Sequence, residues 1–243
     1  YEALRPWVAR IADGEPRVLT RAPVTMLERT SGSTAAAKWV PYTDGLLADF
    51  GAATSPWLDD VTRAFPRLLT ARHYWSVSPA ARAPEVTKGG LRVGLEDDTE
   101  YFDPLTRAAM KRLFPIDGRV SRLADVEEWK RQTLRALLAA EDLGFISVWN
   151  PSFLTLLMEA IEPAWLSDTQ RRAVDRMGFV GEALWPRLQL ISCWTDAWAQ
   201  QALPALRRFF PQTLLQGKGL LATEGVVTFP LWGQAAPVAA VTT

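Results

Sequence analysis

A run of small, hydroxyl-bearing residues is the part of this sequence with the clearest capacity for chemistry. It reads Thr30-Ser31-Gly32-Ser33-Thr34, then three alanines, then Lys38. Glycine allows close approach of the backbone, and N–H groups together with hydroxyls in such a loop form a cradle for an anion. Lys38 adds a point charge that meets a phosphate oxygen or stabilises the loop itself. The pattern indicates phosphate binding.

This run has two other interpretations. A short Gly/Ser/Thr cluster taken alone is more often a surface turn than a binding loop. A kinase-type or GTPase-type phosphate loop ends in Gly-Lys-Ser/Thr, whereas here Ala37 precedes Lys38 and Trp39 follows it. The sequence therefore disfavours that class of nucleotide site.

A second candidate lies far downstream, at Ala222-Thr223-Glu224-Gly225. A lone glutamate on a loop is most often a solvated carboxylate. Cys193 and His73 are the only cysteine and the only histidine, which excludes an internal disulfide and a multi-histidine metal centre. Any bound metal must then have oxygen ligands, as Mg²⁺ prefers. A nucleophilic role for Cys193 has no supporting pattern, because His73 is distant in sequence.

Composition limits the partners of the chain. Its 243 residues are 48% hydrophobic and 22% charged, which is typical of a globular protein. The 27 basic and 27 acidic residues cancel, so nucleic acid is not expected as a partner. No run approaches the roughly 20 apolar residues of a membrane span, and no signal peptide is evident, which favours the cytoplasm. Because the sequence starts at Tyr1 rather than Met, we expect residues to be missing there.

The elements that must position these motifs alternate between strands and helices. An amphipathic helix is predicted over 1–11, and strands are predicted over 24–28 and 39–41. A second helix is predicted to begin at a cap formed by Thr43 or Asp44 and to run to Phe50. Asp125 is predicted to cap a helix that Gly144 stops, and Asn150-Pro151 to begin another. Further strands are predicted over 145–149, 188–194 and 213–215, and Pro204 is expected to break the helical segment after Asp196. The fold class is therefore α/β, with a mixed sheet flanked by helices.

Tryptophan is abundant, with 11 residues in the chain. Such a number fits either an aromatic substrate pocket or ordinary core packing. Trp129, Trp149, Trp185 and Trp194 fall at core-like positions of predicted helices and strands. Core packing is therefore the preferred interpretation.

The two motifs, taken in order, resemble the first and second signatures of the adenylate-forming superfamily. The likeness is most specific to the auxin-responsive Gretchen Hagen family of acyl-acid amido synthetases, especially its bacterial members. Further segments with that family's pattern are Tyr1-Glu2-Ala3-Leu4-Arg5-Pro6, 11–15, 149–154 and 184–186. The similarity runs nearly from end to end.

The resemblance implies a function and a set of site residues. Thr30, Ser31, Gly32, Ser33, Thr34 and Lys38 would bind the phosphates of ATP, Thr223 the α-phosphate, and Glu224 would hold Mg²⁺ as the metal ligand. Thr223 and Glu224 would be the catalytic pair. Leu220 stands where many plant members have Tyr, so an aromatic contact with the nucleotide is not carried over. Asp196 stands where plant members tend to have Gly, so a backbone contact with the acyl substrate is not carried over.

By the same resemblance, residues 1–243 would form part of the N-terminal adenylation domain, without the C-terminal lid domain. The implied reaction is activation of a carboxylic acid as an acyl adenylate, followed by amide formation with an amino acid. Two alternatives stay open: another adenylate-forming ligase, such as one that makes a thioester with coenzyme A, and a catalytically silent binding module. We also expect the two motifs to lie on the same side of one sheet and to line one cleft.

Overall fold

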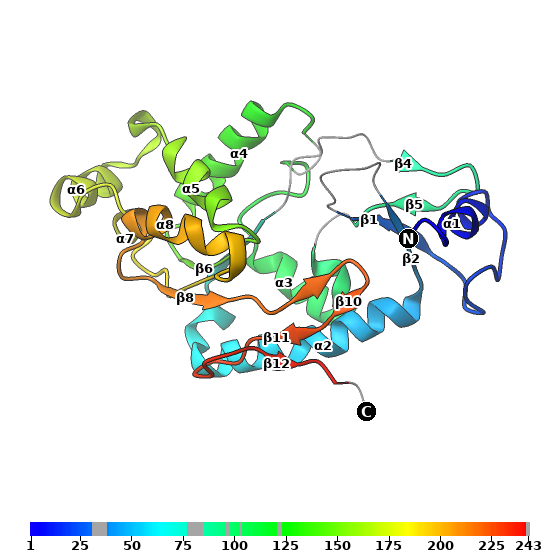
Figure 1. The fold of residues 1–243 in the computed structure, drawn as a ribbon. Coiled ribbons are helices and arrows are strands. Elements are labelled where there is room, and N and C mark those ends of the chain that lie inside the picture. Colours follow the sequence, from blue (N-terminus) through cyan, green and yellow to red (C-terminus); the bar gives the residue numbers. More distant parts are fainter. Residues whose placement is uncertain (31–37, 77–84, 96–97, 103, 121–122, 242–243) are drawn as a thin grey trace.

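The computed structural model describes residues 1–30, 38–76, 85–95, 98–102, 104–120 and 123–241. The chain forms two sheets of four strands each, with most helices gathered around the second sheet (Figure 1). One sheet is mixed and the other is entirely parallel, and helices flank them. The predicted α/β class is confirmed.

The N-terminal sheet is mixed and carries the first motif. Its strands are β1 (Met26–Arg29), β2 (Trp39–Tyr42), β4 (Glu85–Val86) and β5 (Arg92–Val93), in the order β2-β1-β5-β4. β1 is antiparallel to β2 and parallel to β5. Helix α1 (Arg5–Ala12) buries Val8 and Ile11, as its apolar spacing predicts. The strands predicted on either side of the first motif are confirmed.

The second sheet is parallel and lies at the centre of the larger part of the molecule. Its strands are β3 (Arg72–Trp75), β6 (Leu143–Ser147), β7 (Leu190–Cys193) and β8 (Leu214–Gly217), arranged in sequence order. All three pairings are parallel. Every residue of β6 and β7 is buried, as expected of strands covered on both faces.

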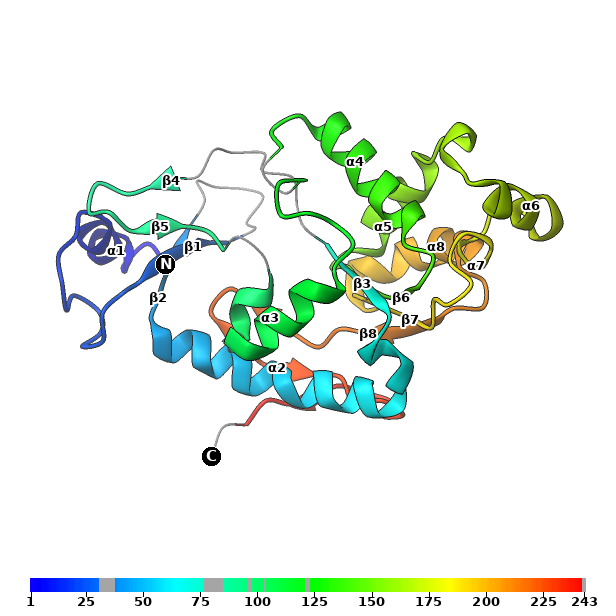
Figure 2. The same ribbon diagram turned by 180° about the vertical axis from the view of Figure 1, so that it is seen from behind.

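Successive residues of these strands enter two different cores. Tyr74, Ile146 and Ile191 pack with the helices on one face. Trp75, Phe145 and Leu190 pack with α2 (Asp44–Ala64) on the other face. Figures 1 and 2 show the resulting layers, with α2 along one side of the parallel sheet and α4, α5 and α8 along the other. The helices of the described residues that follow α2 are α3 (Pro104–Leu113), α4 (Val126–Ala139), α5 (Pro151–Glu159), α6 (Asp168–Met177), α7 (Gly181–Leu184) and α8 (Leu203–Phe209).

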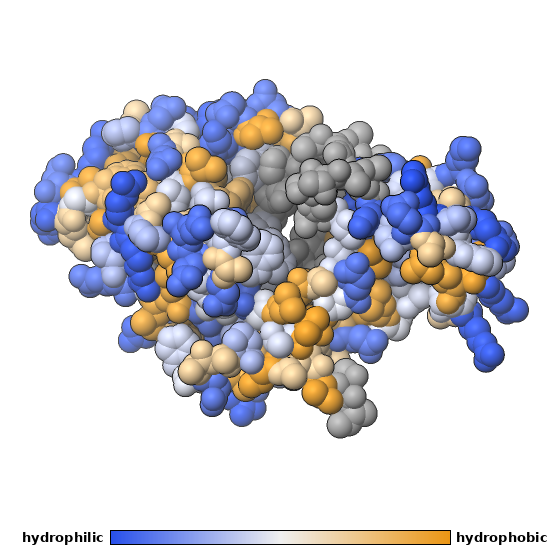
Figure 3. Space-filling model, in the orientation of Figure 1, coloured by the Kyte–Doolittle hydropathy of each residue, from blue (hydrophilic) through white to orange (hydrophobic). Residues whose placement is uncertain are grey.

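The shorter elements complete the chain. Short 3-10 helices occur at η1 (Pro66–Leu69), η2 (Asp98–Tyr101), η4 (Pro163–Trp165) and η5 (Ala197–Ala202). Two hairpins follow the parallel sheet, formed by β9 (Leu221–Ala222) with β10 (Gly225–Val226), and by β11 (Thr228–Phe229) with β12 (Val238–Ala239). Figure 3 shows apolar residues gathered over these hairpins, where Leu220, Val227 and Val241 are exposed.

Three predicted helix caps are confirmed. The side chains of Thr43, Asp125 and Asn150 each accept a hydrogen bond from a backbone N–H of the helix they precede. Each removes one of the unsatisfied donors at a helix N-terminus. Pro151 occupies the first turn of α5, where its missing N–H costs nothing.

Several predicted boundaries were wrong. α2 continues well past Phe50, because Ala53, Trp57 and Val61 extend its buried stripe toward the parallel sheet. Gly144 does not stop α4, which ends at Ala139. Gly144 lies inside β6, where a Cβ would fall 2.6 Å from the Ala71 Cβ. The absence of a side chain at Gly144 lets β6 lie close to the segment that contains Ala71.

Pro204 begins a helix instead of breaking one. It lies in the first turn of α8, directly after the 3-10 turn of η5. The fixed φ angle of proline suits that position. Among the described helices, none combines the length and the apolar character that a bilayer crossing requires.

The single histidine should make folding stability depend on pH. His73 is 4% exposed, its Nε2 lies 2.7 Å from the Leu68 carbonyl oxygen, and its Nδ1 has no partner among the described residues. Burial lowers the pKa of His73 below its ordinary value of 6.5, an effect that the hydrogen bond to Leu68 opposes. Because the unfolded chain binds the proton more readily, this contribution to stability is complete above the unfolded pKa and is lost as pH falls below it.

We expect His73→Phe to flatten the pH dependence of stability between about pH 7 and pH 5, a window above the ordinary pKa range of carboxylates. Urea unfolding of both proteins at several pH values measures the difference. If the free energy of unfolding changes with pH in the same way for both proteins, His73 does not contribute to the pH dependence of stability. Since the chain has 1 histidine, no other imidazole complicates the comparison.

Candidate active site at the carboxyl edge of the parallel sheet

The first motif connects two antiparallel strands. The Thr30 N–H donates to the Lys38 carbonyl oxygen at 2.9 Å, which closes the base of the loop between β1 and β2. Ser31, Gly32, Ser33 and Thr34 lie outside the described residues. Lys38 is exposed, and its ammonium group lies 5.5 Å from the centroid of the Tyr1 ring. The two ends of the predicted phosphate loop thus directly adjoin the paired strands β1 and β2.

The second motif forms the turn of a hairpin. Thr223 and Glu224 lie between β9 and β10, and the Glu224 side chain is exposed. On either side of this turn, Leu221 and Val226 pack against the core cluster of Met26, Tyr42 and Phe50. The hairpin is therefore anchored to the N-terminal sheet by apolar contacts.

A hydrogen bond joins the strand that follows the first motif to the turn of the second motif. Tyr42 lies at the end of β2, four residues after Lys38, and its hydroxyl donates to the Thr223 carbonyl oxygen at 2.6 Å. The Tyr42 side chain is fully buried, and its ring stacks on Phe50 with centroids 5.8 Å apart. The strand that follows the predicted phosphate loop thus holds the turn that carries Glu224.

This arrangement differs from the expectation that both motifs would lie on one sheet. β1 and β2 belong to the mixed sheet, whereas β9 and β10 form a separate two-stranded sheet. Strand β2 meets the β9–β10 hairpin through side-chain contacts, and among the described residues no backbone ladder connects the two. Sequence periodicity does not reveal contacts of that kind.

Tyr42→Phe should test the connection between the motifs. The variant keeps the stacked ring but removes the hydroxyl that fixes Thr223, and a buried neutral hydrogen bond is worth about 1 kcal/mol of stability. We expect a small decrease in melting temperature and a several-fold loss of turnover, because the turn becomes less well oriented. Thermal unfolding and steady-state kinetics of the full-length protein measure both. Unchanged kinetics would mean that turnover does not depend on the hydrogen bond from Tyr42 to Thr223.

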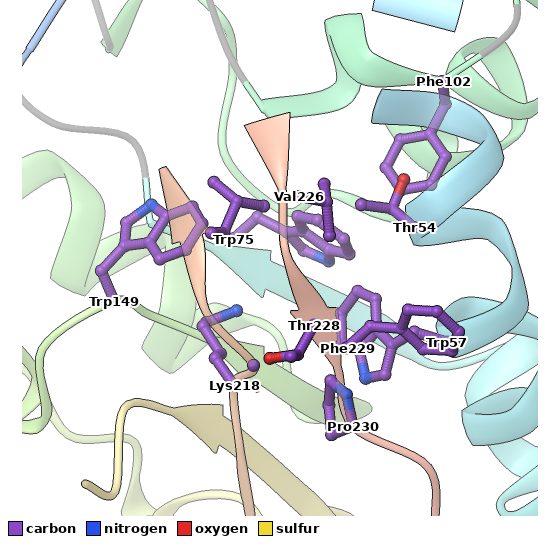
Figure 4. Close-up of a pocket in the computed structure, with 12 residues that line it drawn as sticks. Thr54, Trp57, Trp75, Phe102, Trp149, Lys218, Val226, Thr228, Phe229 and Pro230 are labelled. Atoms are coloured by element: carbon purple, nitrogen blue, oxygen red, sulfur yellow. The ribbon is translucent and has the colours of Figure 1, made fainter. Parts of the chain in front are cut away.

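A cavity of about 70 Å³ lies beside this hairpin, bounded by α2 and the parallel sheet (Figure 4). Trp75, Trp149 and Lys218 stand at or just beyond the carboxyl ends of β3, β6 and β8, the edge at which open α/β sheets bind ligands. Leu221 and Val226, which flank the Thr223–Glu224 turn, line the same cavity. The rest of the described lining consists of Thr54, Trp57, Phe102, Gly219, Thr228, Phe229 and Pro230.

The sequence interpretation missed this cavity. Trp129 and Trp185 are buried in the core, as predicted. Trp149 instead lines the cavity and Trp194 is 37% exposed, with their ring centroids 5.4 Å apart. Both rings follow the carboxyl ends of strands, where the chain leaves the core, so their predicted core placement was wrong. Position after a buried strand is the signal that could have identified them.

The second motif contains one exposed carboxylate, that of Glu224. Within the described ranges, no three His, Cys, Asp or Glu side chains cluster as a metal site. Glu224 stands exposed at a hairpin turn and takes part in none of the described ion pairs. Mg²⁺ commonly uses one or two carboxylates together with phosphate oxygens. Burial raises the pKa of Cys193 to about 11, which leaves its thiol protonated and unreactive.

Comparison with known proteins shows the family to which the chain belongs. The family model described as "GH3 family N-terminal domain" matches residues 1–171. A search of curated proteins gave no match.

Two solved structures have the same fold. The AtGH3.15 acyl acid amido synthetase in complex with 2,4-DB superposes with a TM-score of 0.74 at 18% sequence identity, covering 94% of this chain and 46% of that one. A structure of the GH3.15 acyl acid amido synthetase gives a TM-score of 0.68 at 18% identity, with the same coverage of 94% and 46%. The chain thus spans about half the length of these structures. The fold and the family match together show that the chain belongs to the GH3 family.

Proposed function

We propose that this chain is part of an enzyme that activates a carboxylic acid with ATP and then joins it to an amino acid. The observation that carries the proposal is the hydrogen bond from Tyr42 to Thr223, which holds the strand that follows the first candidate motif against the turn of the second. Family membership supports it, as does the adjacent cavity at the carboxyl edge of the sheet. Phosphate-binding groups next to an apolar cavity suit a reaction between a nucleotide and an organic acid.

The first step makes the acid reactive. A carboxylate oxygen attacks the α-phosphorus of ATP, the bond from that phosphorus to the bridging oxygen breaks, and pyrophosphate leaves with the electron pair. The product is a mixed anhydride of the acid and AMP. Because two anions must meet, positioning and charge neutralisation provide most of the acceleration.

Each motif has a role in this step. Backbone N–H groups and hydroxyls of Ser31, Gly32, Ser33 and Thr34 bind the departing phosphates, with Thr30 and Lys38 at the ends of the loop. Thr223 orients the α-phosphate. Glu224 would hold Mg²⁺, which would supply positive charge beside the phosphate groups when bound.

The acid occupies the cavity lined by Trp57, Trp75 and Trp149. There its carboxylate lies near the Thr223–Glu224 turn, because Leu221 and Val226 belong both to the cavity wall and to that hairpin. In the second step the amine nitrogen attacks the acyl carbon, an amide bond forms, and AMP leaves. Residues 1–243 would provide part of the adenylation domain, and a C-terminal lid domain would complete the site.

Acid-dependent exchange of labelled pyrophosphate into ATP tests the proposal. The full-length protein should catalyse this exchange with some members of a panel of carboxylic acids and should then form an amide when amino acids are added. A thioester formed with coenzyme A, in place of an amide, would identify a different acyl ligase. Absence of exchange with every acid would contradict the proposed activity and would leave a binding role.

A further inference from the structure

Helix α1 is fixed on the mixed sheet, next to the first motif. Ile11 of α1 and Leu27 of β1 share a buried cluster, against which Trp39 of β2 packs. The turn that leads into the helix is closed by the Tyr1 carbonyl oxygen, which accepts a hydrogen bond from the Arg5 N–H at 3.0 Å. Figures 1 and 2 show α1 beside this sheet. The backbone that carries Tyr1 is therefore held relative to β2.

The Tyr1 side chain makes two contacts with residues at the end of the first motif. Its hydroxyl accepts a hydrogen bond from the Trp39 N–H at 2.9 Å, on the edge strand of the sheet. The Lys38 ammonium group lies 5.5 Å from the centroid of its ring, within the range of a cation–π contact. The hydroxyl thus fixes the ring to the backbone of β2, and the ring contacts the charged side chain one residue before that strand.

The contact with Tyr1 holds the Lys38 ammonium group without neutralising it, because a neutral phenol ring carries no net charge. Among the described residues, no carboxylate forms an ion pair with Lys38. Lys38 is exposed, so an anion can reach its ammonium group. A lysine side chain loses rotational freedom when it binds a ligand, and one that a ring already holds loses less.

We propose that Tyr1 is a positioning residue for Lys38, and that it strengthens binding of the ATP phosphates by holding this charge in place. Tyr1 acts only through Lys38 and does not itself touch the nucleotide. Positioning a charged group before the ligand arrives raises affinity, because less entropy is lost on binding. The inference rests on the proposed function, in which Lys38 meets a phosphate, and it adds a residue that lies outside both motifs.

Titration of the full-length protein with α,β-methylene-ATP, followed by calorimetry, measures nucleotide affinity. We expect Tyr1→Leu to weaken binding about two- to fivefold, the size of an exposed cation–π contact. Tyr1→Phe keeps the ring but loses the hydrogen bond to β2, and it should weaken binding less. Lys38→Met should weaken binding at least about tenfold.

A matched control lies on the same helix. The Arg10 guanidinium lies 4.9 Å from the centroid of the Trp7 ring, so this pair is also a contact between a cation and an aromatic ring. Trp7→Leu removes that contact away from the first motif and should leave nucleotide affinity unchanged. Melting temperatures show whether each variant is folded.

A double-mutant cycle separates positioning from a merely structural role. When Lys38→Met is already present, Tyr1→Leu should cause no further loss of affinity, since Tyr1 acts through the missing charge. Pyrophosphate exchange supplies a second readout. Tyr1→Leu should raise the KM for ATP about two- to fivefold and leave the KM for the acid nearly unchanged.

The inference is overturned if wild-type protein does not bind the analogue, if folded Tyr1→Leu or Lys38→Met binds it as tightly as wild type, or if the two substitutions weaken binding independently. Failure of the proposed function has a different signature. Wild-type protein would then show no exchange with any acid, while the titrations still report on Tyr1 and Lys38.

Discussion

Glu224→Gln is expected to lower acid-dependent pyrophosphate exchange by at least about a hundredfold in the full-length enzyme. The substitution preserves the shape and most hydrogen-bonding capacity of the side chain but removes the charge that would hold Mg²⁺ against the α-phosphate. Loss of one electrostatic stabiliser of a phosphate transition state has an effect of about this size. Because Glu224 is exposed on a hairpin turn, its replacement removes no core packing.

The comparison of exchange rate with melting temperature decides the role of Glu224. The melting temperature should hardly change, since surface substitutions away from special features usually alter stability by less than about 0.5 kcal/mol. Glu162→Gln, at another exposed glutamate, provides the matched control and should behave as wild type in both assays. Near-normal exchange in Glu224→Gln would exclude the metal role. An inactive and unfolded variant would instead show that Glu224 is structural.

Trp185→Ala is expected to destabilise the protein by about 3–5 kcal/mol, the cost of truncating a buried Trp. Trp185 is 1% exposed, and its ring lies nearly parallel to that of Phe210, with centroids 6.5 Å apart. Its Nε1–H donates to the Leu137 carbonyl oxygen at 2.7 Å. Truncation would leave a cavity and an unsatisfied carbonyl where α4, α7 and α8 meet on one face of the parallel sheet.

Two further variants separate burial from residue type. Trp185→Phe retains most of the ring and should cost clearly less than Trp185→Ala, with the lost hydrogen bond as a remaining penalty. Trp198→Ala, at a position that is 84% exposed, should change stability by less than about 0.5 kcal/mol. Denaturant unfolding measures all three. Equal effects at Trp185 and Trp198 would contradict the packing described for this helical layer.

Local signals in the sequence predicted some of the elements near the candidate site, but not β3 or the β9–β10 and β11–β12 hairpins. The caps at Thr43, Asp125 and Asn150 act within one helical turn, so the residues that form them are visible in the sequence. The strands that bracket the first motif likewise follow from short-range patterns. Where the interpretation failed, as for Gly144, a contact between distant segments outweighed local propensity.

By itself, the sequence determined the α/β class, the order of the two motifs and the likeness to a family. It could not place Tyr42 against Thr223, which are 181 residues apart, nor gather Trp57, Trp75, Trp149 and Lys218 around one cavity. Those contacts depend on how the strands of the parallel sheet are ordered and on which face α2 covers. A side chain at the end of a strand has the same local pattern whether it enters a core or a cavity. Only the tertiary structure decides between the two.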